Sequence, residues 1–279
     1  MLHYPNINPT IVKIGALQIR WYGVMYILAF LASYFLVKYQ IRKKRLNINI
    51  NTVNDLFLFL IIGLIIGARL GYIVFYNLPF YLSHPLKLFA IWEGGMSFHG
   101  GLIGIIFSGL IFVKKHRVNF WLIADLISVT APIGLGLGRL GNFINAELYG
   151  RVTNLPWGMI FPSGGVLPRH PSQLYEFFLE GILLFVILWW IKDFHFKKGT
   201  VFCLFLILYS IFRFFIEFFR EPDPQLGFIF SFITMGQALS IIMCILGLVL
   251  LYFRPEKGKT TVTTQSSGAH GSRLKNDED

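Results

Sequence analysis

Hydrogen-bonding and charged residues crowd into one short stretch of the chain, GRLGNFINAELYG, which runs from residue 138 to residue 150. This stretch follows an apolar run and contains Arg139, Asn142, Glu147 and Gly150. Placing so many polar groups beside lipid without a polar ligand is costly. Guanidinium groups match the oxygens of phosphate. The stretch therefore predicts an anion site, with a capped loop as the alternative.

A second group of charges lies in RFFIEFFREPD. Arg213, Glu217 and Arg220 are spaced four and three residues apart, so they share one helix face on which the carboxylate can pair with either arginine. A structural ion pair is one interpretation. The other is that two arginines facing one carboxylate leave a spare positive charge, which phosphate would satisfy.

Other residues of similar type are more ambiguous. Arg69 lies in GARLGY near the end of an apolar run, where both a site residue and an arginine that extends to the interface fit. His99 and His170 each precede or open an apolar run, and a lone histidine is more often structural than catalytic. Tyr22 and Tyr26 are one helical turn apart and are either interfacial aromatics or part of a cavity wall.

The segment GLGRLG, residues 136 to 141, matches the GxGxxG pattern of dinucleotide-binding proteins. It ends an apolar helix with no strand before it, so we reject that interpretation. We expect its glycines to let the chain break and turn at the membrane surface. No spacing of metal ligands is present, and the sequence predicts neither a metal nor a cofactor.

The elements that must position these residues are apolar runs of about 20 residues, the length that spans a membrane. With 55% hydrophobic and 14% charged residues, the chain has too few polar groups to cover a soluble globule. We predict an all-α integral membrane protein, because helices satisfy their own backbone in lipid. The seven predicted spans are residues 21–39, 56–76, 96–113, 120–138, 173–191, 200–219 and 235–253.

Clusters of Lys and Arg fix the orientation. The basic segments are residues 41–45, 114–117, 192–198 and 254–259, and a seven-span chain places all of them on one side. That side is predicted to be cytoplasmic, with the N-terminus outside and the C-terminus inside. The net charge of +11 therefore reflects the basic loops that set the membrane topology, and nucleic acid is not an expected partner.

Three regions follow from this organisation. We expect an outer-face arm at residues 1–20, a transmembrane catalytic domain at residues 21–253 with a small outer-face segment between spans four and five, and a disordered cytoplasmic tail at residues 254–279.

Taken together, several separated motifs resemble those of the prolipoprotein diacylglyceryl transferase family. They are GRLGNFINAELYG, FHGG at His99, GARLGY at Arg69, RHPSQLYE near His170 and RFFIEFFREPD at Arg213. The resemblance covers about residues 21 to 253. It implies a multi-pass enzyme of the bacterial inner membrane, with its active site toward the periplasm, that moves the diacylglyceryl group from phosphatidylglycerol to the lipobox cysteine of a prolipoprotein signal peptide. A thioether forms and glycerol phosphate leaves, without a cofactor.

The resemblance also implies roles for the residues. Arg139 and Arg213 are expected to face the phosphate, and His99 is the candidate base for the thiol, with headgroup binding as its alternative. The expected substrate-binding residues are Tyr26, Arg69, Asn142, Glu147, Gly150, Glu217 and Arg220. The competing function is a lipid transporter or flippase, which predicts polar groups that reach through to the cytoplasmic half.

Overall fold

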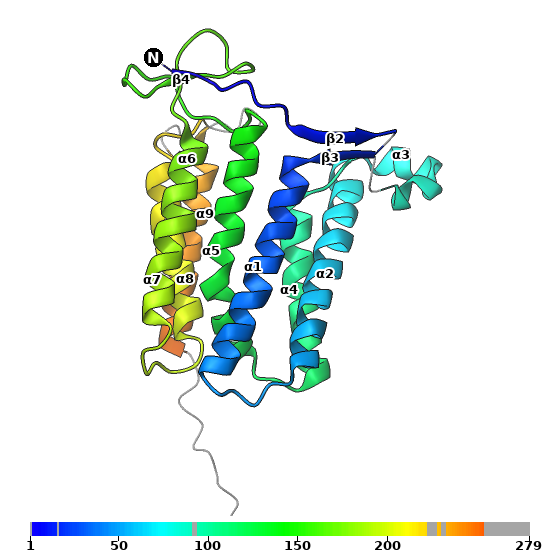
Figure 1. Ribbon diagram of the computed structural model, residues 1–279, viewed down its shortest axis with the longest axis vertical. Coiled ribbons are helices and arrows are strands. Elements are labelled where there is room, and N and C mark those ends of the chain that lie inside the picture. The colour runs from blue at the N-terminus through cyan, green and yellow to red at the C-terminus, as the bar shows by residue number, and fades with distance from the viewer. Residues whose placement is uncertain (1, 16, 91–93, 222–227, 230–232, 254–279) are drawn as a thin grey trace, which may run out of the picture.

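The computed structural model describes residues 2–15, 17–90, 94–221, 228–229 and 233–253. The protein is a bundle of helices that lie side by side, with short strands at one end (Figure 1). The helices are α1 (Trp21–Lys43), α2 (Ile50–Tyr76), α3 (Leu78–Ser83), the 3-10 helix η1 (Pro85–Phe89), α4 (Phe98–His116), α5 (Phe120–Ile144), α6 (Ser172–Glu176), the π-helix η3 (Phe177–Leu183), α7 (Leu184–Ile191), α8 (Thr200–Ile216) and α9 (Met235–Phe253). Segments α6, η3 and α7 form one continuous helix.

Every predicted span coincides with one of these helical segments, because each apolar run is long enough to satisfy its backbone internally. Five described helices are long and apolar enough to cross a membrane, and α8 is a shorter apolar helix. The predicted class, an all-α integral membrane protein, is confirmed for the bundle. Polar caps begin several helices: the side chains of Asn49, Ser97 and Asn119 each accept a backbone hydrogen bond at the start of α2, α4 and α5.

Short strands lie outside the bundle, which the sequence did not predict. Strand β1 (Leu2–His3) pairs in parallel with β4 (Met159–Ile160), whereas β2 (Thr10–Ile14) and β3 (Leu17–Arg20) form an antiparallel hairpin. Strands β5 (Phe228–Ile229) and β6 (Ile233–Thr234) form another antiparallel pair. The predicted outer-face arm is therefore partly β-structured, and β1 ties it to the segment between α5 and α6.

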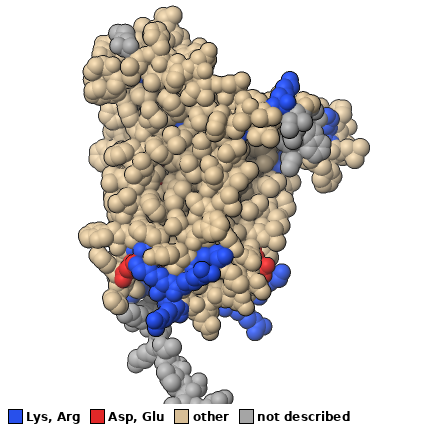
Figure 2. All heavy atoms as spheres, in the orientation of Figure 1, with Lys and Arg blue, Asp and Glu red and all other residues tan. Residues whose placement is uncertain are grey.

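The two ends of the bundle differ in charge. We call the end that carries β1 and β4 the strand end and the opposite end the basic end (Figure 1). Lys and Arg side chains form a band across the visible face at the basic end, while the middle of that face is almost uncharged (Figure 2). Three of the four predicted basic segments lie at the basic end. The fourth, residues 254–259, and the rest of the predicted tail lie outside the described residues.

Glycines spaced four residues apart on α2, at Gly63, Gly67 and Gly71, form one smooth helix face that allows α4 to approach closely. A Cβ added at Gly67 would lie 2.7 Å from Cα of Gly104, and one added at Gly71 would lie 2.7 Å from Cα of Gly100. Backbone therefore packs on backbone between these two helices.

Helices α2 and α4 form one pair in the bundle, and α5 is central to a second group of helices. It contacts α1, α6, η3, α7 and α8. The predicted break at Gly136–Gly141 is wrong, because α5 runs unbroken to Ile144. Close packing explains two of these glycines instead. A Cβ on Gly136 would lie 3.0 Å from Cα of Gly181 in η3, and one on Gly141 would lie 2.6 Å from the ring of Tyr22. Because Gly136 has no side chain, η3 can pack directly against α5. This packing brings the polar groups of the two helices close together.

Candidate active site

A buried carboxylate, that of Glu176 at the end of α6, joins two arginines from different helices. Its Oε2 atom lies 2.6 Å from Nε of Arg139 on α5 and 2.8 Å from Nη1 of Arg213 on α8. The Glu176 side chain is 0% exposed, whereas those of Arg139 and Arg213 are 21% and 12% exposed. The carboxylate therefore holds both guanidinium groups from the interior and leaves part of each arginine accessible.

A second buried carboxylate, that of Glu180, lies one turn further along the same helix. Its oxygens are 3.9 Å from Nε of Arg139 and 3.9 Å from Nη1 of Arg213. Neither oxygen has a hydrogen-bond partner within the described part of the chain. Glu180 lies in the π-helix η3, and π turns inside α-helices are frequent at functional sites.

Glu217, just after α8, extends the network toward the strand end. Its Oε2 lies 2.7 Å from Nη2 of Arg213, and its Oε1 lies 3.6 Å from Nη1 of Arg220. The sequence predicts that this carboxylate can pair with either arginine, and in the structure it contacts both. We call the resulting network the ion cluster. Its members are Arg139, Glu176, Glu180, Arg213, Glu217 and Arg220.

The ion cluster corrects the prediction of a spare positive charge at Arg213 and Arg220. Three glutamates face three arginines, because Glu176 and Glu180 approach from the neighbouring helix. Spacing along one helix cannot reveal partners that arrive from another. A signal was present, however: two carboxylates four residues apart interrupt the apolar run QLYEFFLEGILLF, and ionisable groups within a span usually mark a site.

A chain of polar contacts connects Arg139 to the loop that follows α5. Nη1 of Arg139 donates to Oδ1 of Asn142 at 3.4 Å, and Nδ2 of Asn142 donates to Oε1 of Glu147 at 2.9 Å. The backbone oxygen of Glu147 in turn accepts from Nε2 of Gln173 at 2.6 Å. Asn142 and Gln173 are both buried. This chain fixes the loop relative to α6.

Gly150 is where three separate segments meet. Its amide donates to the backbone oxygen of His170 at 2.8 Å, and it forms an isolated antiparallel bridge with Arg220. A Cβ at this position would lie 2.7 Å from Cβ of His170. A residue without a side chain is therefore required, and Gly150 brings the stretch from residue 138 to residue 150 against the end of α8.

Two tyrosines complete the surroundings of the ion cluster. Tyr26 on α1 stacks edge-on against Tyr22, with ring centroids 5.2 Å apart, and interacts electrostatically with Arg139. Tyr209 lies one turn before Arg213 on α8 and interacts with Glu180 and Arg213. Sequence reasoning missed Tyr209, because a tyrosine in an aromatic-rich helix carries no distinctive signal.

Arg69 lies on α2, and its side chain is committed to backbone. Nε donates to the oxygen of Leu88 at 3.0 Å, and each terminal nitrogen donates to two further carbonyls. The carbonyls on the terminal nitrogens belong to Lys87, Ala90, Gly94 and Gly95. A guanidinium group has five N–H donors, and all five are used. The structure thus gives Arg69 the geometry of a clamp on the segment between α3 and α4.

His99 lies in the first turn of α4, and its side chain is exposed. Helix α4 packs against α2, whereas Arg139 and Arg213 belong to the group of helices around α5. The candidate base and the ion cluster are therefore carried by different parts of the bundle. The clamp of Arg69 reaches Gly94 and Gly95, a few residues before His99, so these two predicted site residues are structurally linked.

An apolar cavity of about 340 Å³ lies beside the ion cluster. Ile216, the neighbour of Glu217, forms part of its wall together with Leu179 and Phe215. Few polar atoms face this cavity. Two polar groups of its wall are paired with each other, because Nε1 of Trp157 donates to the hydroxyl of Tyr175 at 2.8 Å. The cluster of charges thus has an adjacent space suited to hydrocarbon.

A family model for prolipoprotein diacylglyceryl transferase matches residues 9–253. The chain belongs to the prolipoprotein diacylglyceryl transferase family. The region of the chain that the family model matches contains the whole ion cluster, Arg69 and His99. The family membership expected from the sequence is confirmed. Because the chain contains several membrane-spanning helices, this family member is a multi-pass membrane protein.

Similar members of the family are bacterial proteins named phosphatidylglycerol-prolipoprotein diacylglyceryl transferase. The one from Geobacter sulfurreducens is 54% identical over 249 residues, which cover 89% of this chain and 96% of the relative. The one from Desulfotalea psychrophila is 53% identical over 261 residues, with 91% and 96% covered. A third, from Coxiella burnetii, is 49% identical over 248 residues, with 88% and 95% covered.

Proposed function

We propose that this protein transfers the diacylglyceryl group of phosphatidylglycerol to the lipobox cysteine thiol of a prolipoprotein, and that glycerol phosphate is released. The names of the relatives support both substrates. The structural observation that carries the proposal is the meeting of Arg139 and Arg213 at one oxygen of Glu176.

The two arginines are suited to hold the lipid phosphate. Guanidinium groups bind phosphate oxygens through paired hydrogen bonds. Glu176 and Glu180 are fully buried, while Arg139 and Arg213 retain some exposure, so a phosphate approaches the arginines from the side opposite the carboxylates. The carboxylates fix both arginines before substrate arrives, which is the preorganisation that stabilises developing charge effectively.

The reaction itself is a substitution at carbon. The cysteine sulfur forms a bond to the terminal glycerol carbon of the diacylglyceryl group, and the bond between that carbon and the phosphate oxygen breaks. The electron pair of the broken bond stays on the phosphate, which leaves as glycerol phosphate. Arg139 and Arg213 would stabilise the added negative charge on the leaving group.

The thiol must lose its proton to become a good nucleophile. His99 is the base that we propose, with headgroup binding as its alternative role. In the alternative, the positive field of the arginines favours the thiolate, and the proton leaves with the glycerol phosphate. Either route balances the reaction, because the dianionic leaving group can accept one proton near neutral pH.

The remaining site residues would shape the headgroup pocket. Asn142 and Glu147 fix the loop beside Arg139, and Gly150 brings that loop against Arg220. We propose substrate-binding roles for Tyr26, Asn142, Glu147, Gly150, Glu217 and Arg220. For Arg69, whose donors are all committed to backbone, we propose an indirect contribution through the segment that leads to His99.

We further propose that the protein lies in the bacterial inner membrane with the strand end toward the periplasm. The basic clusters at the opposite end support this orientation through the positive-inside rule. The apolar cavity beside Glu217 supports acceptance of acyl chains near that end.

One experiment distinguishes a transferase from a flippase. Purified protein in vesicles is incubated with phosphatidylglycerol and a lipobox peptide. A transferase yields a thioether-linked peptide, and a matched peptide with serine in place of the cysteine yields none. Movement of labelled phosphatidylglycerol between leaflets without any modified peptide would favour the flippase instead.

A further inference from the structure

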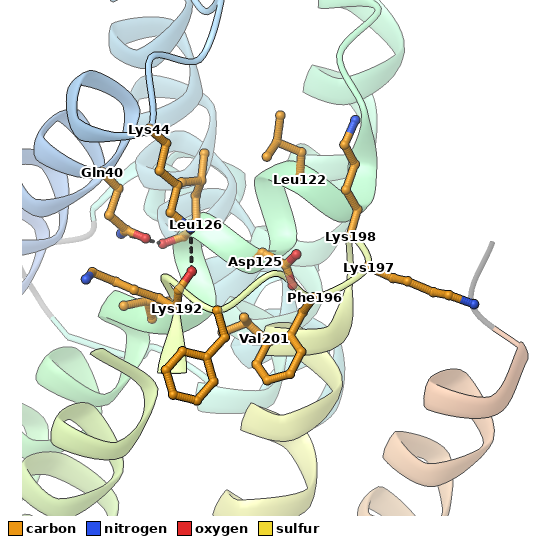
Figure 3. A pocket seen from close by; sticks show the side chains of 12 residues that line it. Gln40, Lys44, Leu122, Asp125, Leu126, Lys192, Phe196, Lys197, Lys198 and Val201 are labelled. Carbon is orange, nitrogen blue, oxygen red and sulfur yellow. Dashed lines mark hydrogen bonds between the residues drawn. The ribbon is translucent and has the colours of Figure 1, made fainter. Parts of the chain in front are cut away.

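A cavity of about 140 Å³ lies at the basic end of the bundle, at the opposite end from the ion cluster. The end of α1, the first turns of α5 and the connection between α7 and α8 enclose it (Figure 3). A single water needs only about 10–15 Å³. The space is therefore large enough for a polar group of several heavy atoms.

Several residues with ionisable side chains line this cavity. Its ionisable lining residues are Lys44, Lys192, Lys197, Lys198 and Asp125. Nζ of Lys192 is paired with Oδ2 of Asp193 at 2.8 Å, and the side chain of Lys197 extends away from the other labelled side chains (Figure 3). The lysines that we assign to attracting an anion are therefore Lys44 and Lys198.

The carboxylate of Asp125 has another task. Its Oδ2 accepts from the backbone amide of Gly199 at 2.7 Å, and its Oδ1 accepts from that of Phe202 at 2.9 Å. Asp125 therefore stabilises the first turn of α8, where amide groups lack partners within the helix. Both of its oxygens already accept hydrogen bonds from the protein backbone.

Lys44 is positioned to bind an anion. Its Nζ donates to the backbone oxygen of Lys192 at 2.6 Å, which uses one of the three donors of an ammonium group (Figure 3). Burial lowers the pKa of Lys44, since the ammonium is partly removed from water. An anion in the cavity would offset that loss of solvation.

Gln40 supplies a second, independent observation. Its side chain is 1% exposed, and its Nε2 donates to the backbone oxygen of Leu126 at 3.2 Å. Its Oε1 is buried and has no hydrogen-bond partner within the described residues. Because buried polar atoms are normally paired, this oxygen indicates a missing donor. A hydroxyl group on a ligand in the cavity would supply it.

Membrane topology alone does not account for these features. The positive-inside rule explains exposed basic residues in short loops. It does not require a cavity whose wall includes a buried glutamine oxygen without a hydrogen-bond partner among the described residues. Basic pockets between helices on the cytoplasmic side do bind the headgroups of anionic lipids.

We propose that this cavity binds the phosphate of an anionic phospholipid whose headgroup carries a hydroxyl donor. The lipid would occupy the leaflet at the basic end, with its phosphate near Lys44 and Lys198 and its hydroxyl near Gln40. The site is separate from the ion cluster and does not depend on the proposed transfer reaction.

A local measurement is needed, because phosphatidylglycerol is also the proposed substrate at the other end. Hydrogen-deuterium exchange of residues 192–199 in the full chain, in detergent, reports on this site alone. The probes are dihexanoyl phosphatidylglycerol, dihexanoyl phosphatidylcholine and inorganic phosphate. The variant is Lys44→Gln with Lys198→Gln, and the matched control is Lys114→Gln with Lys115→Gln, which removes two lysines from the last turn of α4.

We expect phosphatidylglycerol to protect residues 192–199 in the wild type and in the control, with an apparent affinity about tenfold or more weaker in the Lys44 and Lys198 variant. Transfer activity should remain within about twofold in both variants, because neither pair contacts the ion cluster. Equal protection by phosphatidylcholine would overturn the role of charge, and equal protection by inorganic phosphate would show a site for free phosphate. Unchanged affinity in the variant, or no protection at all, would refute the site.

Discussion

Arg139 on α5 and Arg213 on α8 share one partner atom, Oε2 of Glu176, at 2.6 and 2.8 Å. Two positive charges that are largely removed from water would otherwise repel each other and lack solvation. The shared carboxylate fixes both guanidinium groups in one place inside the bundle. The positions of the groups that we assign to phosphate binding therefore depend on a third residue, on another helix, that has no assigned contact with the lipid.

The substitution Glu176→Gln should destabilise the protein strongly. It keeps the shape of the side chain but leaves two largely buried arginines without their common anion, and breaking a buried pair costs about 3–5 kcal/mol. The melting temperature in detergent measures the effect. The control is Glu221→Gln, which removes the half-exposed partner of Arg169 and should cost only about 0–1 kcal/mol. Equal melting temperatures for the two variants would show that the shared ion pair does not stabilise the bundle.

Two glycines on α5 offer a matched test of the packing that positions Glu176. A Cβ at Gly136 would lie 3.0 Å from Cα of Gly181, whereas a Cβ at Gly138 would meet no atom within 4 Å. We expect Gly136→Ala to lower both the melting temperature and the transfer rate, because η3 must move away. Gly138→Ala should leave both unchanged or raise stability slightly, since alanine favours the helix. The opposite order would mean that η3 does not approach α5 at Gly136.

The substitution Arg69→Lys should loosen the segment between α3 and α4. A lysine has three donors in place of five, so at least two of the five backbone carbonyls lose their partner. Hydrogen exchange of residues 85–90 should become faster, with little change around Glu176. Arg20→Lys, at an exposed arginine of β3, is the control. Unchanged exchange in Arg69→Lys would show that the clamp does not order this segment.

Acid should destabilise the strand end through His170. Burial lowers the pKa of its ring below the ordinary value of 6.5. Because the folded pKa is lower than the unfolded one, the unfolded state binds the proton more readily, and stability falls as the pH drops from about 6.5 toward the folded pKa. We expect melting temperatures of the wild type to decline between about pH 7 and pH 5. The decline should be smaller in His170→Gln, and parallel curves would exclude His170 as its source.

Much of this arrangement follows from the sequence. Apolar length predicts the helices, the lysine and arginine clusters predict that basic residues gather at one end of the bundle, and the spacing of Arg213, Glu217 and Arg220 predicts their pairing. Glu176 and Glu180 were not identified, because their partners lie on α5 and α8 and no local spacing encodes contacts between helices. The glycines of residues 136–141 were misinterpreted for the same reason. The role of Gly136 is visible only once Gly181 is known to lie opposite it.

The central claim is that Arg139 and Arg213 hold the phosphate that leaves when the diacylglyceryl group moves to a cysteine. The most direct test measures glycerol phosphate and thioether-linked peptide together, with phosphatidylglycerol and a lipobox peptide as substrates. We predict equal amounts of both products from the wild type and from Arg20→Ala, and a loss of at least about 100-fold in Arg139→Ala, which still inserts into the membrane. Wild-type rates in folded Arg139→Ala, or no thioether product from the folded wild type, would contradict the account.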